Sequence, residues 1–206
     1  MMITISKDFG HEIEIKKSRF ICQLKRVSTE VEAREFIAAV KKEHYKANHN
    51  CSAFILGDNQ EIQRTSDDGE PSGTAGVPML EVLKKREVTN ICAVVTRYFG
   101  GIKLGAGGLI RAYAGSVSQA LDAVGLVKIV QQRELILTLD YKLFDSLSNF
   151  LPMAISEQNF AENVQVKVFL DDDKISAFER ELTEKYNGRI AVEQGASRPV
   201  EVNVPK

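Results

Sequence analysis

The stretch from Arg97 to Gly115, RYFGGIKLGAGGLIRAYAG, limits what this chain can form more than any other segment. It holds six of the fourteen glycines within nineteen residues, together with two arginines and a lysine. An apolar, strand-like run precedes it and an amphipathic helix pattern follows, so it joins a buried strand to a helix. Such a junction exposes backbone N–H groups at the helix start, where the helix dipole favours an anion.

The residue types at this junction indicate a surface for phosphate groups. The glycines that allow close approach of a ligand are Gly100, Gly101, Gly105, Gly107 and Gly108. Arg97, Lys103 and Arg111 supply positive charge, and the planar fork of arginine suits phosphate oxygens. Tyr98 or Tyr113 offers a ring on which a base can stack. A second interpretation stays open, because glycines also serve tight turns and close packing, and Tyr113 also fits a core.

The glycine pattern does not match two common nucleotide-binding motifs. Ile110 stands where the third glycine of GxGxxG would fall, and no GK[ST] follows. Dinucleotide-binding and P-loop interpretations are therefore weak.

A second loop, SDDGEPSGTAG from Ser66 to Gly76, gathers three carboxylates, Asp67, Asp68 and Glu70. They could bind Mg²⁺, pair with Arg97 or Arg111, or cap turns and the following helix, and we favour pairing or capping. Hydroxyl groups in the same loop could donate to a ligand or serve the turns; they belong to Ser72 and Thr74.

Histidine and cysteine give little sign of a metal or catalytic site. His44, His49 and Cys51 are close in sequence but lack a fourth zinc ligand. Cys51 could form a thiolate pair with His49, yet it begins an apolar strand, which favours packing. We expect no metal, no cofactor and no catalytic residue.

Composition indicates an ordinary folded protein, with 44% hydrophobic and 27% charged residues among 206. The three cysteines form no CxxC pair, and the start lacks a secretory signal, so we expect a cytoplasmic protein with no membrane partner. Residues 1–130 carry 18 Lys and Arg against 15 Asp and Glu, a net charge of +3, and residues 131–206 carry 9 against 13, a net of −4. A basic surface is therefore more compatible with the first half.

Apolar periodicity predicts alternating strands and helices in the first half. Strands are expected at 17–27, 50–56, 61–66 and 90–99, the middle two as a hairpin, and helices at 28–47, 77–87 and after the glycines. Thr29 and Glu32 fit a capping box. In the third helix the predicted core-facing stripe is Ile110, Ala114, Val117, Leu121 and Val124.

The pattern changes near Val130. The order strand, helix, strand, strand, helix, strand over 131–194 is typical of a ferredoxin-like domain. Gly188 is expected to cap its last helix, and the tail at 195–206 is expected to be loosely held. We therefore predict two domains, 1–130 and 131–206.

The two loop motifs, SDDGEPSGTAGVPML and VVTRYFGGIKLGAGGLIRAYAGSVSQAL, resemble the signature of the IMPACT/YigZ family, and HNCSAF at 49–54 fits a strand start of that family. The likeness covers about 15–125, and the second half is similar to the small C-terminal domain of bacterial members. It implies an α+β fold: an N-terminal α/β sandwich similar to domain IV of elongation factor G, with a left-handed βαβ crossover, and a ferredoxin-like βαββαβ domain similar to domain V. The usual handedness rule would not have suggested that crossover.

The resemblance also marks one set of residues as a common surface, without assigning any of them a catalytic role. By position they are Asp67, Asp68, Glu70, Pro71, Gly73, Thr74, Arg97, Tyr98, Gly100, Gly101, Leu104, Gly105, Gly107, Gly108 and Arg111.

Three functions remain in view. Eukaryotic relatives act in translational control with an additional RWD domain, for which this chain has no room, and bacterial relatives are proposed to bind nucleic acid or the ribosome. We expect a non-enzymatic protein that binds RNA, the ribosome or a protein of the translation machinery. The alternatives are a nucleotide-binding enzyme related to small-molecule kinases, with Asp67, Asp68 or Glu70 holding Mg²⁺ or acting as a base, and a protein-interaction module.

Overall fold

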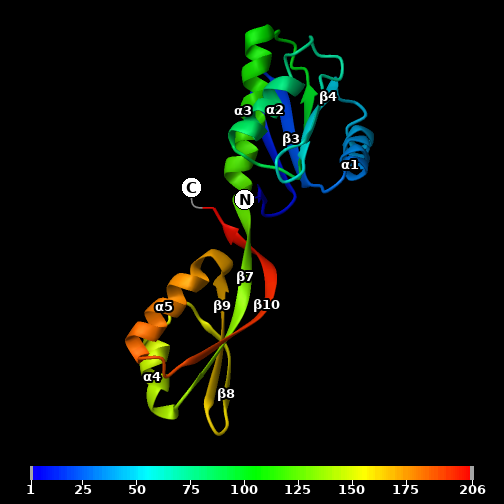
Figure 1. Ribbon diagram of the computed structural model, residues 1–206. Helices are drawn as coiled ribbons and strands as arrows, with labels where there is room; N and C mark the ends of the chain where they lie inside the picture. Colours follow the sequence, from blue (N-terminus) through cyan, green and yellow to red (C-terminus); the bar gives the residue numbers. More distant parts are fainter. Residues whose placement is uncertain (1, 205–206) are drawn as a thin grey trace. The chain divides into compact units, whose positions relative to one another are not determined.

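The structure is a computed structural model that describes residues 2–204, and it divides into two compact units (Figure 1). Of the described residues, the first unit comprises 2–128 together with 202–204, and the second comprises Ile129–Glu201. The sequence had assigned all of 131–206 to the second domain, whereas the chain returns to the first unit at its end. No helix among residues 2–204 is long and apolar enough to cross a membrane.

The first unit is built on an antiparallel sheet in the order β2-β3-β6-β4-β5. Its strands are β2 (Phe9–Ile15), β3 (Ser18–Arg26), β4 (His49–Leu56), β5 (Ile62–Ser66) and β6 (Ile91–Tyr98). Because β3 and β4 both run antiparallel to β6, they are parallel to each other. The helix α1 (Glu30–Glu43) connects them, which makes the βαβ crossover that the resemblance implied.

Helices cover both faces of this sheet. One face packs on α1 through a cluster that includes Phe54, Cys92 and Val94. The other packs on α2 (Gly76–Lys85) and α3 (Ala106–Val124), and Ala93 and Val95 belong to that larger cluster. Since β6 is buried on both faces, its sequence is a continuous apolar run without alternation.

Several local predictions for the first unit are confirmed. The amide of Glu32 donates to Thr29 Oγ1 at 3.2 Å, and the Glu32 carboxylate accepts from the amide of Ser28 at 2.6 Å, so both residues cap α1. The strands β4 and β5 form the expected hairpin, in which Phe54 lies opposite Arg64.

The predicted stripe of α3 is wrong at its start. Ile110 is 41% exposed, whereas Leu109 and Tyr113 face the core, because the Tyr113 ring packs edge-on against Phe20 with centroids 5.3 Å apart. Val117, Leu121 and Val124 are buried as expected. Two elements before residue 16 were not predicted: β1 (Met2–Ile5) and β2.

The second unit has the βαββαβ order that the sequence predicted. Its elements are β7 (Leu126–Leu139), α4 (Tyr141–Phe150), β8 (Ile155–Phe160), β9 (Val164–Asp171), a short 3₁₀ turn η1 (Asp172–Lys174), α5 (Ile175–Tyr186) and β10 (Ala191–Asn203). The strand β9 pairs with β7 and β8, and β10 pairs with β7. Leucines of β7 pack on α4 and α5 to form its core.

Both details predicted for the end of this unit need correction. The C-cap of α5 is Asn187, in the left-handed conformation with φ 50°, and Gly188 follows it. The tail is not loosely held, because β10 continues to Asn203 and the Val204 amide donates to the Leu126 carbonyl at 2.9 Å.

Two glycines of the stretch from Arg97 to Gly115 give a matched test of close packing. A Cβ at Gly100 would lie 2.0 Å from the backbone of Lys17, whereas a Cβ at Gly115, within α3, would meet nothing within 4 Å. Gly100→Ala is therefore expected to destabilise the protein by about 3 kcal/mol, because the backbone must move to relieve the overlap. Gly115→Ala is expected to stabilise it by about 0.5–1 kcal/mol, since alanine is the better helix former. Urea unfolding measures both, and equal effects of the two substitutions would contradict this account.

Candidate anion-binding site

The segment between β6 and α3 is anchored at its beginning and open at its end. The amide of Phe99 donates to Asn48 Oδ1 at 2.8 Å, and that of Gly100 donates to Ser18 Oγ at 3.1 Å. Gly101 and Gly105 have φ angles of 84° and 71°, which other residues rarely adopt. We call the residues from Phe99 to Arg111 the glycine loop.

The end of the glycine loop leaves backbone donors unused. Gly105 is the N-cap of α3 and provides no side-chain cap. Within residues 2–204, the amides of Ala106, Gly107 and Gly108 have no hydrogen-bond acceptor, and the first amide of α3 bonded to the chain is that of Leu109. A Cβ at Gly107 would have only the Arg111 side chain nearby, at 3.6 Å, so a ligand can approach closely.

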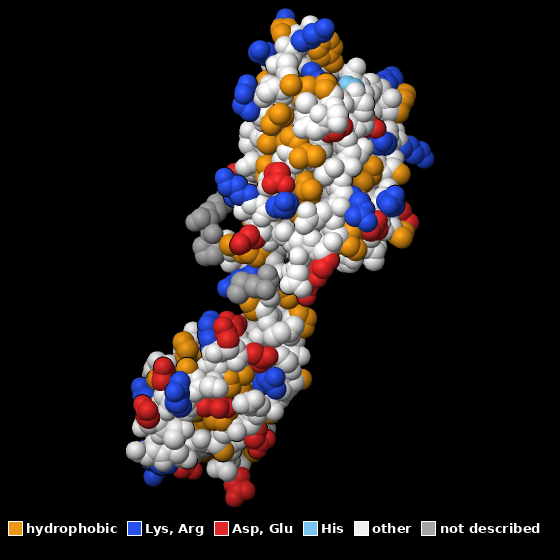
Figure 2. Space-filling view, turned by 45° about the horizontal axis from the view of Figure 1, so that its top comes forward, with side chains coloured by type: hydrophobic (Ala, Val, Ile, Leu, Met, Phe, Trp, Pro, Cys, Tyr) orange, Lys and Arg blue, Asp and Glu red, His pale blue; other side chains and the backbone are white. Residues whose placement is uncertain are grey.

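Two basic side chains next to these amides are exposed and unpaired. Lys103 and Arg111 lie on the surface, and no carboxylate of the described residues forms an ion pair with either. On the face that Figure 2 shows, Lys and Arg side chains are spread over the first unit. The start of α3 therefore combines open donors, positive charge and the positive end of a helix dipole.

A cavity of about 380 Å³ opens beside the glycine loop. It is lined by Asn48, His49, Glu70, Pro71, Arg97, Phe99, Lys103, Leu104, Gly105, Ala106 and Leu109. Residues of the glycine loop thus form one wall, and polar groups from β6 and from the loop at Ser66–Gly76, which we call the acidic loop, form the other.

The structure places Arg97 inside the protein, where only 6% of its surface is exposed. Its Nη1 donates to Glu70 Oε1 at 2.7 Å, and the hydroxyl of Tyr113 donates to the same oxygen at 2.8 Å. The Arg97 Nε is buried without a partner among the described residues, and the guanidinium lies 5.5 Å from the ring centroids of Phe20 and Phe99. Arg97 therefore forms part of the cavity floor and is not an exposed phosphate ligand.

Neither tyrosine presents an open ring. Burial raises the pKa of Tyr113 well above its ordinary value, so its hydroxyl stays protonated and acts as a donor. The hydroxyl of Tyr98 lies 3.0 Å from His44 Nδ1, and Arg19 lies over its ring. Phe99 is 45% exposed and lines the cavity, so it is the ring that the sequence interpretation missed. In the sequence, only the position of Phe99 directly before a Gly-Gly pair could have indicated that its ring is exposed at this site.

Each carboxylate of the acidic loop has its own internal role, which resolves the alternatives that the sequence left open. Asp67 accepts from the amides of Gly73, Ala75 and Gly76 at 2.8, 3.1 and 2.8 Å and caps the start of α2. Burial raises the pKa of Asp67, but these three donors outweigh it and bring the pKa below its ordinary value.

The other acidic side chains pair with cations. Asp68 pairs with Lys41 at 2.6 Å and also accepts from the amide of Asn50, and Glu70 pairs with Arg97. Among the residues that the structure describes, no group of three or more His, Cys, Asp and Glu side chains could hold a metal ion.

Most of the remaining candidate residues also have partners. Thr74 Oγ1 donates to the Pro71 carbonyl at 2.6 Å and so serves the turn, whereas Ser72 is exposed. His49 Nδ1 lies 2.9 Å from the Asp68 carbonyl, and the Cys51 thiol donates to the Asp67 carbonyl. Burial raises the pKa of Cys51 to about 12, which excludes a thiolate near neutral pH.

Comparison with known proteins decides the family. The model of the Impact N-terminal domain matches residues 16–121, and that of a domain of unknown function, DUF1949, matches residues 137–189. The IMPACT family member YvyE of Bacillus subtilis is 51% identical over 195 residues, which cover 93% of this chain and 90% of that protein. The chain belongs to the IMPACT family.

Other comparisons extend this IMPACT-family assignment. The IMPACT family member YigZ of Escherichia coli is 37% identical over 182 residues, covering 86% of this chain and 89% of that one. A solved structure titled as that of a hypothetical protein has 34% identity and a TM-score of 0.58, and the match covers 93% of this chain and 95% of that chain. Both units are therefore common to these relatives.

The buried pair of Arg97 and Glu70 can be tested by a double-mutant cycle. Arg97→Met leaves the Glu70 carboxylate buried without its cation and is expected to cost about 3–5 kcal/mol. Adding Glu70→Gln removes that charge while keeping an oxygen for the Tyr113 hydroxyl, so the double variant is expected to be more stable than Arg97→Met alone. Urea unfolding gives the three values, and additive losses would contradict this coupling.

The cap formed by Asp67 predicts a pH dependence. Asp67→Ala is expected to cost about 1–2 kcal/mol at pH 7, because three amides lose their acceptor. The folded pKa of Asp67 is lowered, so its contribution is complete above the unfolded value of about 3.9 and is lost as pH falls through the folded pKa. The difference in unfolding free energy between wild type and variant should therefore shrink below about pH 4. A difference that stays constant down to pH 3 would exclude this role.

Proposed function

We propose that this IMPACT-family protein is a non-enzymatic binding protein that holds the phosphate backbone of RNA, free or within the ribosome, at its glycine loop. The observation that carries the proposal is the start of α3, where three amides and the cations Lys103 and Arg111 lie side by side and have no partner among residues 2–204. An anion at this position meets both the open N–H groups and the helix dipole. A second observation points the same way, because Arg97 lines the cavity beside the amides and its Nε has no hydrogen-bond partner among the described residues.

The ligand is RNA in this proposal because the site has a phosphate-binding part and an apolar part. Phe99 lines the same cavity as the open amides and is 45% exposed, so the part of its ring that Arg97 does not cover offers a surface on which a base can stack. The first half of the chain has a net charge of +3, which supports a moderate, salt-dependent affinity. The translational role of eukaryotic relatives supports placing this binding in translation and its regulation.

A nucleotide-binding enzyme has less support from the geometry. The carboxylates that would hold Mg²⁺ already cap α2 or pair with Lys41 and Arg97, and of these three only Glu70 lines the cavity beside the glycine loop. A shift of the unfolding temperature that requires Mg²⁺ together with nucleotide, and that is lost in Lys103→Ala/Arg111→Ala, would favour the enzyme over the binding protein.

A protein of the translation machinery is the second candidate partner. Three large apolar side chains of the glycine loop, Phe99, Ile102 and Ile110, are exposed. Exposed apolar side chains that form a contiguous patch often mark a protein-binding site. Co-sedimentation with ribosomes before and after nuclease treatment separates a protein contact, which survives the nuclease, from an RNA contact, which does not.

The RNA proposal is tested by the salt dependence of binding. The double variant Lys103→Ala/Arg111→Ala is expected to bind a single-stranded RNA more weakly, and the slope of log K against log salt should decrease by about 1.5–2, because two phosphate contacts are lost. Arg86→Ala is the matched control, since Arg86 is also in the first unit but pairs with Asp122 away from the loop. Fluorescence anisotropy at several salt concentrations gives both values. An unchanged slope, or an equal effect of the control, would refute the glycine loop as the site.

A further inference from the structure

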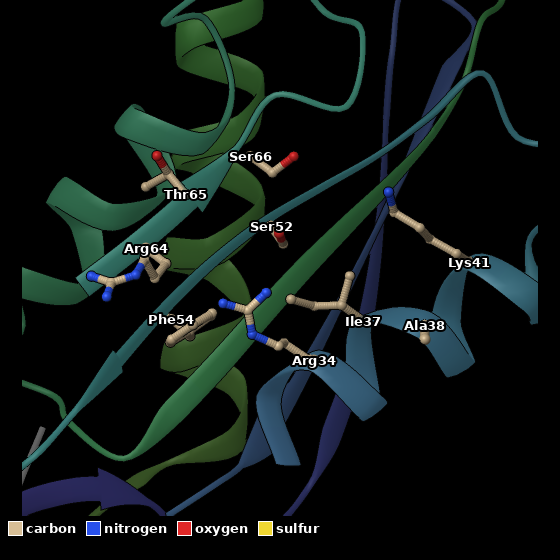
Figure 3. A pocket seen from close by; sticks show the side chains of 9 residues that line it. All are labelled: Arg34, Ile37, Ala38, Lys41, Ser52, Phe54, Arg64, Thr65 and Ser66. Carbon is tan, nitrogen blue, oxygen red and sulfur yellow. The ribbon is translucent and has the colours of Figure 1, made fainter. Parts of the chain in front are cut away.

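A second cavity lies on the side of the first unit that α1 covers, away from the helices α2 and α3. It has a volume of about 350 Å³ and lies between α1 and the hairpin of β4 and β5 (Figure 3). We call it the α1 pocket, and the lining residues that matter here are Arg34, Ile37, Lys41, Ser52, Phe54 and Arg64. None of them belongs to the glycine loop, so the α1 pocket is independent of the site proposed above.

The strand register explains why these side chains meet. Phe54 lies opposite Arg64 and Ser52 opposite Ser66 in the hairpin, and directly opposed residues point to the same face of a sheet. Phe54 packs with the α1 cluster, so Ser52 and Arg64 face α1 as well. Figure 3 shows that Arg34 and Lys41 reach the same hollow from the helix.

The positive charge of the α1 pocket is only partly compensated. Arg34 and Arg64 share one carboxylate, Glu30, at 3.2 and 3.3 Å, and Lys41 pairs with Asp68. The three cationic side chains are 43–68% exposed, so each pair is weak and an anion can compete for the cations. Glu30 thereby holds two guanidinium groups close together, with an excess of positive charge.

The α1 pocket also offers an unused hydroxyl group. Ser52 lines the pocket, and no described residue forms a hydrogen bond with its hydroxyl. The oxygen is not among the buried atoms that lack a partner, so it is open to the pocket and free to donate to a ligand there. Because the surrounding side chains are cations, this donor favours a ligand with negatively charged oxygens.

We propose that the α1 pocket binds a small phosphate ester of about mononucleotide size. Arg34 and Arg64 bind the phosphate oxygens, and the Ser52 hydroxyl donates to one of them. The organic part of the ester lies on the apolar floor formed by Ile37 and Phe54. The volume of the pocket is within the range of about 300–1,000 Å³ that small-molecule sites occupy. The ester is either a free nucleotide or the terminal phosphate of an RNA chain.

Titration followed by amide NMR of the whole protein tests the proposal. The probes are adenosine 5′-monophosphate, adenosine, and one RNA oligonucleotide with and without a 5′-phosphate. We expect the monophosphate to shift the amides of Ser52 and Arg64, and adenosine to leave them unmoved. If RNA shifts the same amides only when it carries the 5′-phosphate, the ester is the end of an RNA chain. If neither RNA shifts them, the ester is a free nucleotide. No shift with either phosphorylated probe at millimolar concentration, or shifts confined to residues 103–111, would overturn the proposal.

Four variants separate ligand binding from stability. Arg34→Ala and Arg64→Ala should each weaken monophosphate binding about tenfold, as expected for the loss of a charged hydrogen bond. Arg86→Ala, a cation outside the pocket, should leave it unchanged. Glu30→Gln should tighten binding, because the competing carboxylate is neutralised. An equal loss in all three arginine variants, or weaker binding in Glu30→Gln, would contradict the proposal.

Ser52→Ala gives the sharpest contrast. It should weaken monophosphate binding while leaving the urea midpoint equal or higher, because the removed hydroxyl forms no hydrogen bond with any described residue. A lower midpoint with unchanged affinity would mean that the hydroxyl serves the fold alone. Lys103→Ala/Arg111→Ala should retain monophosphate binding, so a failure of the glycine-loop proposal and a failure of this one are distinguishable.

Discussion

The candidate site depends on one buried carboxylate. Glu70 accepts from Arg97 on β6 and from Tyr113 on α3, and so it ties the acidic loop to a strand and to a helix that lie far from it in sequence. Removing either donor would leave charge or a polar group in a dry environment, which is why the three groups act together. The two hydrogen bonds to Glu70 fix the end of β6 and the inward face of α3. The glycine loop connects these two elements. Its open amides are therefore held in place by contacts that they do not make themselves.

Much of the fold follows from local patterns, and the exceptions have physical reasons. The buried strand β6 and the cap of α1 at Thr29 were readable, because burial on two faces and the capping pair leave clear signals. The strand β2 was not predicted, because the apolar residues of its half-buried face, Phe9, Ile13 and Ile15, are interrupted by His11. The tail was judged by position, although its pairing within β10 depends on distant residues. Tyr113 faces the core in place of Ile110 because its ring packs against Phe20. Phe20 lies outside α3, so the helical periodicity could not predict this contact.

The candidate site was only partly predictable for a related reason. Composition and spacing drew attention to the glycines and to Lys103 and Arg111, whose surroundings depend on local backbone. Pairing of a loop carboxylate with Arg97 was among the favoured alternatives, but composition and spacing could not tell that this pair is buried, because Glu70 comes from a separate loop. The Asp67 carboxylate was a potential metal ligand until the folded loop brought three amides to it. Charged residues that are close in sequence thus have partners decided by topology.

The burial of all three thiols has a consequence for the lifetime of the protein. Cys22, Cys51 and Cys92 are buried and unbridged, and burial raises the pKa of each, to about 12 for Cys51 and Cys92. Peroxides and electrophiles attack the thiolate, which is scarce at these positions in the native state. Oxidative damage to these sulfur atoms would thus require the chain to open first, so the chemical durability of the thiols is governed by how often the first unit unfolds.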